Sequence, residues 1–302
     1  MYRFAIYSFV LLTSLASTAW AGNITLLLSA NSGPYAEFAA SFSDAMETTT
    51  RWKILPATKL EATSPSGERP DLIVSAGGEA LRQALESSTT IPIIATLLPR
   101  QSYEKIVAQS SNRQTRVTAI FLDQPPARQA AFLRHLLPEQ KRIGMLFSSE
   151  TRNQANQYRQ AFKNAGLTLE SAESDTPNSL LPTLNTLLAR VDILLAIPDG
   201  TIYKRENIKP ILVTSYRHQR PVVAFSAPFV SAGALAALHT TPAQIARQTA
   251  DLINQMGPQL PAPMLPGQFA ISINANVAEA LGLAVPGEAE LRRAMLADSE
   301  PR

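Results

Sequence analysis

Residues 220–228 read RPVVAFSAP and residues 91–99 read IPIIATLLP, so two similar phrases lie in separate halves of the chain. Each is a short apolar run with a proline at its second position and another at its end. Each also follows, by about one helix length, an apolar run that begins with aspartate: residues 71–74 (DLIV) precede the first phrase, and residues 192–195 (DILL) precede the second. This order is typical of a strand–helix–strand unit, and we predict two such units, one in each of two similar α/β domains.

Short apolar runs recur along the chain, and several of them lack polar alternation. Such runs are typical of strands that are buried on both faces, as in parallel sheets. Amphipathic segments between the runs predict helices from residue 35, over residues 151–165 and over residues 241–256. Alternating strands and helices predict an α/β fold, here as two similar doubly wound lobes. The predicted strands are residues 23–29, 71–75, 91–97, 117–122, 142–147, 192–197, 222–225, 234–238 and 269–273.

The first 21 residues have the pattern of a secretory signal peptide. Arg3 precedes an apolar segment, residues 4–15, and the small residues Ala19 and Ala21 stand three and one positions before the expected cleavage site. The apolar segment is too short to cross the ~30 Å hydrocarbon core of a bilayer. We therefore predict a signal peptide over residues 1–21 and a periplasmic mature protein.

Composition narrows the classes of function. The 302 residues carry 27 Lys and Arg against 24 Asp and Glu, a balance that predicts no nucleic-acid partner. The chain has no cysteine, so it forms no disulfide and lacks the acylated residue of a lipoprotein. His135, His218 and His239 are dispersed without the spacing of metal ligands, so we predict no metal and no cofactor.

Motifs for catalysis are nearly absent. The sequence has no G-x-S-x-G, no P-loop, no H-E-x-x-H and no G-x-G-x-x-G after a strand. Residues 102–105 (SYEK) match the S-x-x-K of penicillin-binding enzymes, but the companion motifs of those enzymes are missing. A periplasmic hydrolase is therefore a minor alternative, and we predict a protein with no catalytic residues.

Candidate binding residues lie where the predicted strands end, because ligands of open α/β sheets bind beyond the carboxyl ends of the strands. These residues are small, polar and mostly uncharged. Asp199 is suited to hold a ligand ammonium group, while Tyr35 and Phe225 are suited to line an apolar pocket. Each residue type also caps helices, forms turns or packs in cores, so a structural role stays open for each. The candidates are Ser29, Ser32, Tyr35, Ser75, Gly77, Gly78 and Thr96 in the first half, and Ser148, Ser149, Asp199, Thr201, Phe225 and Ser226 in the second.

From residue 191 onward the sequence resembles the type I periplasmic binding proteins, specifically the ABC-transporter substrate-binding family that includes receptors for tryptophan and tyrosine. The resemblance extends more faintly over residues 23–286. After the first strand, however, residues 32–36 read SGPYA where family members of the aromatic-amino-acid type usually carry H-P-x-L-D, so the substrate is not carried over. The phrases that carry the resemblance are residues 191–199 (VDILLAIPD), 220–226 (RPVVAFS), 231–238 (SAGALAAL) and 273–274 (IN), which lead to 280–283 (ALGL).

The resemblance implies two lobes joined by three chain crossings that together form a hinge. The crossings map near residues 119–123, 231–235 and 266–270. Lobe one then comprises residues 22–119 with 236–265, and lobe two comprises residues 120–235 with 266–302. The implied function is capture of a small polar solute, such as an amino acid, by a monomer that delivers it to an ABC permease in the inner membrane. The alternative is a ligand sensor read by a membrane histidine kinase or chemoreceptor.

Overall fold

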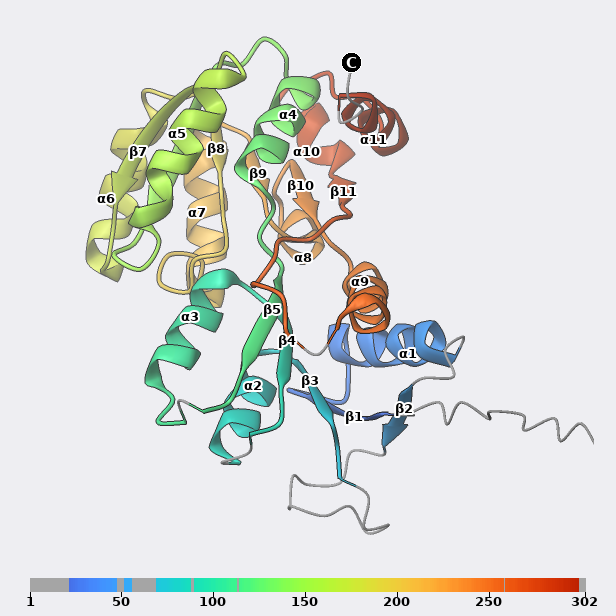
Figure 1. Ribbon diagram of the computed structural model, residues 1–302. Helices are drawn as coiled ribbons and strands as arrows, with labels where there is room; N and C mark the ends of the chain where they lie inside the picture. The colour runs from blue at the N-terminus through green and yellow to red at the C-terminus, as the bar shows by residue number, and fades with distance from the viewer. Residues whose placement is uncertain are drawn as a thin grey trace, which may run out of the picture.

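The computed structural model describes residues 22–47, 52–55, 69–87, 90–112, 114–257 and 259–298. The predicted signal peptide, residues 1–21, lies outside the described residues. Two α/β lobes are stacked end to end, each built around its own sheet (Figure 1). The first sheet has the order β2-β1-β3-β4-β5, and the second has the order β11-β10-β9-β8-β6-β7. All strand pairs are parallel except β10 with β11, which confirms the predicted fold class.

The first sheet is covered by helices on both faces. Helices α1 and α9 pack on one face through Phe38, Phe42 and Ile245, while α2 and α3 pack on the other through Leu81 and Ile106. Helix α9 comes from much later in the chain than the other elements of this lobe. The elements are β1 (Gly22–Leu28), α1 (Pro34–Glu47), β2 (Trp52–Leu55), β3 (Leu72–Ala76), α2 (Gly78–Glu86), β4 (Ile93–Leu98), α3 (Arg100–Gln109), β5 (Val117–Phe121) and α9 (Pro242–Gln255).

The second sheet is also buried between two layers of helices. Its cores contain Phe132, Phe162 and Leu291 on one face, and Leu184 and Ile211 on the other. The elements are α4 (Pro126–Leu136), β6 (Arg142–Phe147), the 3-10 turn η1 (Arg152–Gln154), α5 (Ala155–Asn164), β7 (Thr168–Glu173), α6 (Pro177–Leu188), β8 (Ile193–Leu195), α7 (Arg205–Arg217), β9 (Val222–Ala224), α8 (Ala227–Ser231), β10 (Ala236–His239), β11 (Ala270–Ile273), α10 (Ala275–Ala280) and α11 (Glu288–Ala297).

The two lobes repeat one arrangement, as the paired sequence phrases predict. The order β2-β1-β3-β4 in the first sheet matches β7-β6-β8-β9 in the second. The aspartate before each inner strand makes the same contact: Asp71 Oδ2 accepts the N–H of Asn23 at 2.8 Å, and Asp192 Oδ2 accepts the N–H of Arg142 at 2.9 Å. Each aspartate thus fastens the start of one strand to the start of its neighbour.

The nine predicted strands are all present, but two strands were missed. These are β2 and β7, which form one edge of each sheet. Strand β7 (TLESAE) contains no fully buried residue, and β2 is only four residues long. An edge strand pairs on one side and faces solvent on the other, so it needs no apolar run that a sequence pattern could reveal.

The chain passes between the lobes three times. The passages follow β5 at residues 122–125, follow β10 at residues 240–241, and precede β11 at residues 265–269, because Met264 still bridges Ile120 of the first sheet. The second passage corrects the expected boundary: residues 236–239 pair with β9 and β11, so they lie in lobe two, as does the expected crossing at 231–235. The first passage also starts after residue 121, because Phe121 still pairs with Leu98 in the first sheet. In both places the apolar run completes a sheet before the chain leaves it.

One chain of hydrogen bonds, which we call the hinge bonds, joins the three passages. Gln124 Nε2 donates to Thr240 Oγ1 at 2.6 Å, and Thr240 Oγ1 donates to the C=O of Gln268 at 3.0 Å. Arg128, from the start of α4, donates to Gln124 Oε1 at 2.8 Å and to the C=O of Pro266 at 2.9 Å. The passages therefore form one connected unit and not three independent linkers.

Candidate functional site

Three of the predicted residues in lobe one lie against one another at the carboxyl edge of the first sheet. Gly77 has φ +94°, and a Cβ atom added to it would lie 2.4 Å from Ser29 Oγ and 2.7 Å from Tyr35 Cε1. Ser29 Oγ also accepts the N–H of Ala80, in the first turn of α2, at 3.0 Å. Glycine is therefore required at position 77, both for the positive φ and for the close approach.

Two further predicted residues of this lobe lie outside that cluster. Ser32 is exposed in the loop before α1. Gly78 is the first residue of α2, and a Cβ atom there would lie 3.2 Å from Ile106 Cδ1 on α3. Gly78 thus allows α2 and α3 to pack closely.

Three predicted hydroxyl residues are fully buried: Ser75, Thr96 and Ser148 each have 0% exposure. Thr96 Oγ1 donates to the C=O of Ser75 at 3.2 Å, and Ser148 Oγ accepts the N–H of Glu150 at 3.2 Å. This differs from the expectation that these hydroxyls face a solute. Strands β3 and β4 are buried along their whole length and β6 is buried from residue 143 onward, so the side chains at their carboxyl ends lie in the interior.

Asp199 is a buried carboxylate whose hydrogen-bond donors all belong to lobe two. Its Oδ2 accepts the N–H of Ser148 at 3.1 Å and the hydroxyl of Thr151 at 2.6 Å. Its Oδ1 accepts the N–H groups of Thr201 at 2.8 Å and Ile202 at 3.0 Å. Asp199 therefore ties the loop after β6 to the loop after β8. This differs from the expected contact with a ligand ammonium group, because both carboxylate oxygens are already occupied.

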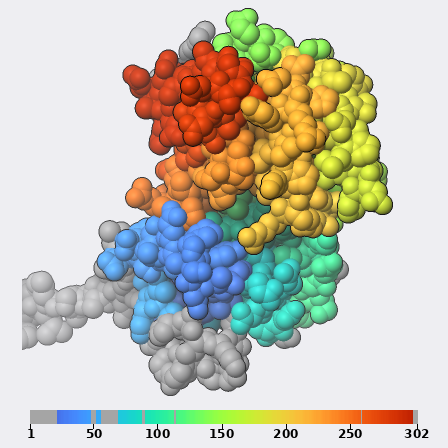
Figure 2. All heavy atoms as spheres, turned by 180° about the vertical axis from the view of Figure 1, so that it is seen from behind, coloured from blue at the N-terminus to red at the C-terminus, as the bar shows by residue number. Residues whose placement is uncertain are grey.

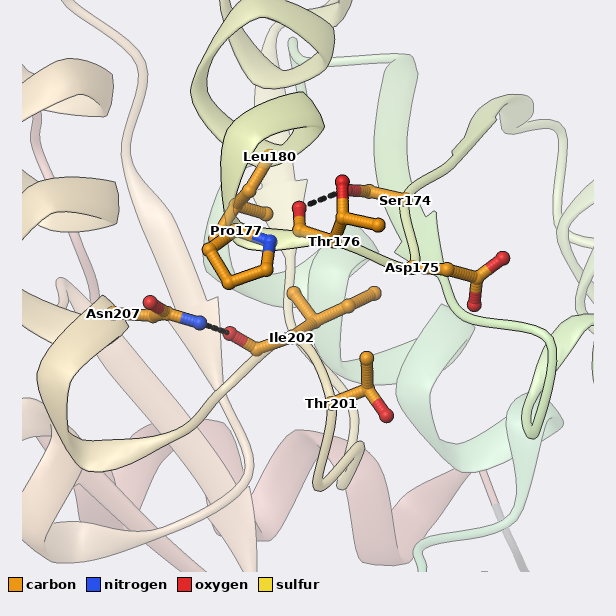
Figure 3. Close-up of a pocket in the computed structure, with 8 residues that line it drawn as sticks. All are labelled: Ser174, Asp175, Thr176, Pro177, Leu180, Thr201, Ile202 and Asn207. Atoms are coloured by element: carbon orange, nitrogen blue, oxygen red, sulfur yellow. Dashed lines mark hydrogen bonds between the residues drawn. The ribbon is translucent and has the colours of Figure 1, made fainter.

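A small cavity lies in lobe two between the loops that precede α6 and α7 (Figure 3). Its volume of about 10 Å³ is enough for roughly one water molecule and too small for an amino acid. Thr201 lines it, and Asn207 Nδ2 closes one side by donating to the C=O of Ile202 at 2.9 Å. Ser149 is exposed near this region and donates its N–H to Asp175 at 2.6 Å. The cavity is lined by Ser174, Asp175, Thr176, Pro177, Leu180, Thr201, Ile202 and Asn207.

Phe225 belongs to a cluster of three aromatic rings beyond the end of β9. Its ring lies edge-on to Tyr203 and Phe229, with centroids 5.9 Å and 5.6 Å away. Tyr203 and Phe229 are buried, whereas Phe225 is partly exposed. Burial raises the pKa of the Tyr203 hydroxyl, which has no hydrogen-bond partner among the described residues. Ser226 is the N-cap residue of α8 and makes no side-chain cap.

The two lobes touch through Glu150, in the loop after β6. Gln101 Nε2 and Lys105 Nζ, both from α3 of lobe one, donate to its carboxylate, the lysine at 2.8 Å. Helix α3 starts beyond the carboxyl end of β4, so this contact joins the carboxyl edges of the two sheets. Figure 2 shows the lobes meeting across a recessed part of the surface. Lys105, which completes the S-x-x-K match, is thus engaged in an ion pair between the lobes.

Arg100 and Asp123 lie close to this contact, and the sequence argument did not select either as a site residue. Asp123, in the first passage, is 9% exposed and accepts the N–H of Arg100 on Oδ2 at 2.7 Å. Burial raises the pKa of the Asp123 carboxyl. Burial also raises the pKa of the Tyr158 hydroxyl on α5 of lobe two, and the negative charge of Asp123 raises it further. Asp123 therefore lies between elements of both lobes. The only feature of the sequence that could have indicated Arg100 and Asp123 as site residues is that each stands just after the carboxyl end of a strand.

Among the described residues, no helix is both long and apolar enough to cross a membrane. In the same part of the chain, no cluster of three or more His, Cys, Asp or Glu side chains is arranged to hold a metal ion.

The chain belongs to the family described as ABC transporter substrate binding protein, whose model matches residues 60–286. Members of this family are non-enzymatic binding proteins, and membership implies a small-molecule ligand and an ABC permease as partner. The comparison confirms the family predicted from the sequence. Among curated proteins, no significant match was found.

Solved structures that match this chain share its two-lobed fold. A substrate-binding protein with adhesive properties from Clostridium difficile, in a ligand-free open structure, matches with a TM-score of 0.65 at 17% identity, over 88% of this chain and 95% of its own. An ABC domain from Streptococcus pneumonia in complex with L-Trp gives 0.59 at 18% identity, over 90% and 98%. A conserved domain protein from Vibrio cholerae gives 0.59 at 20% identity, over 92% and 98%.

Proposed function

We propose that this protein captures a small polar solute between its two lobes in the periplasm and delivers it to an ABC permease. The contact of Glu150 with α3 is the observation that supports this most, because it brings together the edges where α/β sheets bind ligands. The hinge bonds add to it, since a connected hinge allows the lobes to move as bodies.

An amino acid is the solute class that we favour. The L-Trp complex of the pneumococcal domain is a precedent for an amino-acid ligand within this fold. The partly exposed ring of Phe225 offers an apolar contact in lobe two, and Ser29 and Tyr35 are near the edge of lobe one.

Thermal-shift screening of the protein without residues 1–21 tests this function. The screen uses the twenty L-amino acids, four nucleosides and a set of mono- and disaccharides. A ligand at ~100 times its dissociation constant stabilises the folded state by ~2.7 kcal/mol, which is readily measured. Stabilisation by one compound class supports the proposal. If no compound of any class shifts the midpoint or binds in calorimetry, the proposal is wrong.

A further inference from the structure

A groove lies on the surface of lobe two between helix α7 and the end of α8. Its volume is about 460 Å³, and its lining combines apolar side chains with two cations. Among the described residues that line it there is no carboxylate, because Glu206, the one acidic residue of α7, lies outside the groove. The lining residues are Arg205, Ile208, Lys209, Leu212, Val213 and Ala232.

An exposed stripe along α7 extends the groove. Arg205, Lys209 and Val213 follow one another four positions apart, so they lie on one face of the helix, and Tyr216 adds to that face three positions later. Val213 and Tyr216 are 41% and 48% exposed, and they are two of the four large hydrophobic side chains exposed in the described part of the chain. Apolar surface gathered in this way marks a contact with a protein or a membrane.

The two cations of the groove have no partner of their own within the described residues. Neither Arg205 nor Lys209 forms an ion pair or a side-chain hydrogen bond there, whereas Arg142 is paired with Asp192 at 2.7 Å. Helix stability does not explain their position, because Arg205 is the first residue of α7, where the helix dipole disfavours positive charge. Both cations are therefore available to carboxylates of another molecule.

The groove begins at the end of lobe two that faces lobe one. Helix α7 follows β8, and β8 is parallel to β6, so the first turn of α7 lies at the same sheet edge as the loop of Glu150 that contacts lobe one. Figure 2 shows the gold atoms of this region beside the boundary between the lobes. A protein that receives a solute from between the lobes must contact this end of lobe two.

We propose that the groove on α7 is a docking surface for the ABC permease, and that it takes a periplasmic segment of the permease with a carboxylate beside apolar side chains. Arg205 and Lys209 bind the carboxylate, while Leu212 and Val213 contact the apolar side chains. An anionic membrane fits less well, since clusters of about four to eight Lys or Arg hold such surfaces and the groove has two. This inference rests on the proposed function, because it needs a permease as partner.

Uptake by spheroplasts tests the docking surface. Spheroplasts of the source bacterium, washed free of periplasmic proteins, receive the purified protein and the labelled compound that gives the largest shift in the thermal screen. The wild type should restore uptake. Lys209→Glu and Val213→Glu each place a negative charge in the groove, so each should need at least about tenfold more protein for half-maximal uptake. Calorimetry should show that both variants bind the compound as tightly as the wild type does.

Two variants on α11 are matched controls, because this helix lies at the end of lobe two away from lobe one (Figure 1). Arg293→Glu and Leu296→Glu replace an exposed arginine and a 47% exposed leucine, and both should restore uptake like the wild type. Normal uptake with both groove variants, or an equal loss with the controls, overturns the docking surface and leaves solute capture intact. If no compound binds, or if the wild type restores no uptake, the proposed function is wrong as well.

Two other occupants of the groove have readouts of their own. Flotation of the wild type with phosphatidylglycerol vesicles, lost in Lys209→Glu, would assign the groove to a membrane surface. A dimer in light scattering that Val213→Glu separates would assign it to a second copy of this chain. Either result overturns the docking of a permease segment.

Discussion

Replacing Asp199 with asparagine separates a structural role from a role in ligand binding. The carboxylate accepts four hydrogen bonds, two on each oxygen, and is 4% exposed. In Asp199→Asn an NH₂ group replaces one carboxylate oxygen. The two hydrogen bonds to that oxygen are lost, and the two groups that donated them now lie against another hydrogen-bond donor. Hydrogen bonds to a charged group are worth about 1.5–3 kcal/mol each, so we expect the loss of two to lower the free energy of unfolding by about 3–6 kcal/mol.

Urea unfolding followed by far-UV circular dichroism measures this loss. At roughly 2–4 °C per kcal/mol for a chain of this size, thermal unfolding should fall by about 10 °C. Asp175→Asn is the matched control, because Asp175 is exposed and accepts one main-chain N–H, and it should cost less than about 1 kcal/mol. A change below 1 kcal/mol for Asp199→Asn, accompanied by a loss of ligand affinity, would refute the structural role and restore the ammonium contact.

Three further predictions concern the hinge, the contact between the lobes and the half-buried His239. Thr240→Val removes two hinge bonds and leaves Gln124 Nε2 without its partner, so it should destabilise by about 2–3 kcal/mol in urea, whereas Thr240→Ser, which keeps the hydroxyl, should cost less than half of that. Glu150→Gln removes the ion pair with Lys105, whose side chains are 35% and 57% exposed, so it should weaken the contact between the lobes by about 0.2–1 kcal/mol. Interlobe FRET should show this as a smaller fraction of closed molecules. The difference from the wild type should vanish at 1 M salt, and a difference that persists there would contradict an ionic cause. Burial lowers the pKa of His239 below its ordinary value of 6.5, so the unfolded chain takes up a proton at a higher pH than the folded protein does. The free energy of unfolding should therefore fall as the pH drops from 6.5 towards the pKa of the folded state. His239→Gln should flatten this part of the curve of stability against pH, and an unchanged curve would contradict the role of His239.

The fold could be read from the sequence because its central strands are buried on both faces. Residues 93–98 and 143–147 lie between two layers of helices, so they are both largely apolar and inaccessible to solvent. A continuous apolar run therefore predicts both a strand and its burial. The edge strands β2 and β7 escaped because solvent on one side removes that constraint. The second lobe boundary was misplaced because the apolar run at residues 234–238 looks the same whichever sheet it joins.

The candidate site was less accessible to such reasoning. The sequence locates the strand ends, but the direction of each side chain there depends on the packing around it. The side chains of Ser75 and Thr96 lie in the core. Asp199 accepts hydrogen bonds from the loops beside it. Ser29, Tyr35 and Gly77 do lie together, as the prediction required. Contacts such as that of Glu150 with Lys105 join segments that only the folded hinge brings together, so no spacing in the chain could indicate them.

The distance between the lobes with and without ligand tests the central claim most directly. The chain has no cysteine, so Ala108→Cys on α3 and Asn153→Cys beside Glu150 can be labelled without background. Both positions are exposed and lie on opposite sides of the contact between the lobes. A saturating ligand from the screen should shorten and narrow the distribution of label-to-label distances. An unchanged distribution in the presence of a ligand that calorimetry shows to be bound would contradict capture between the lobes.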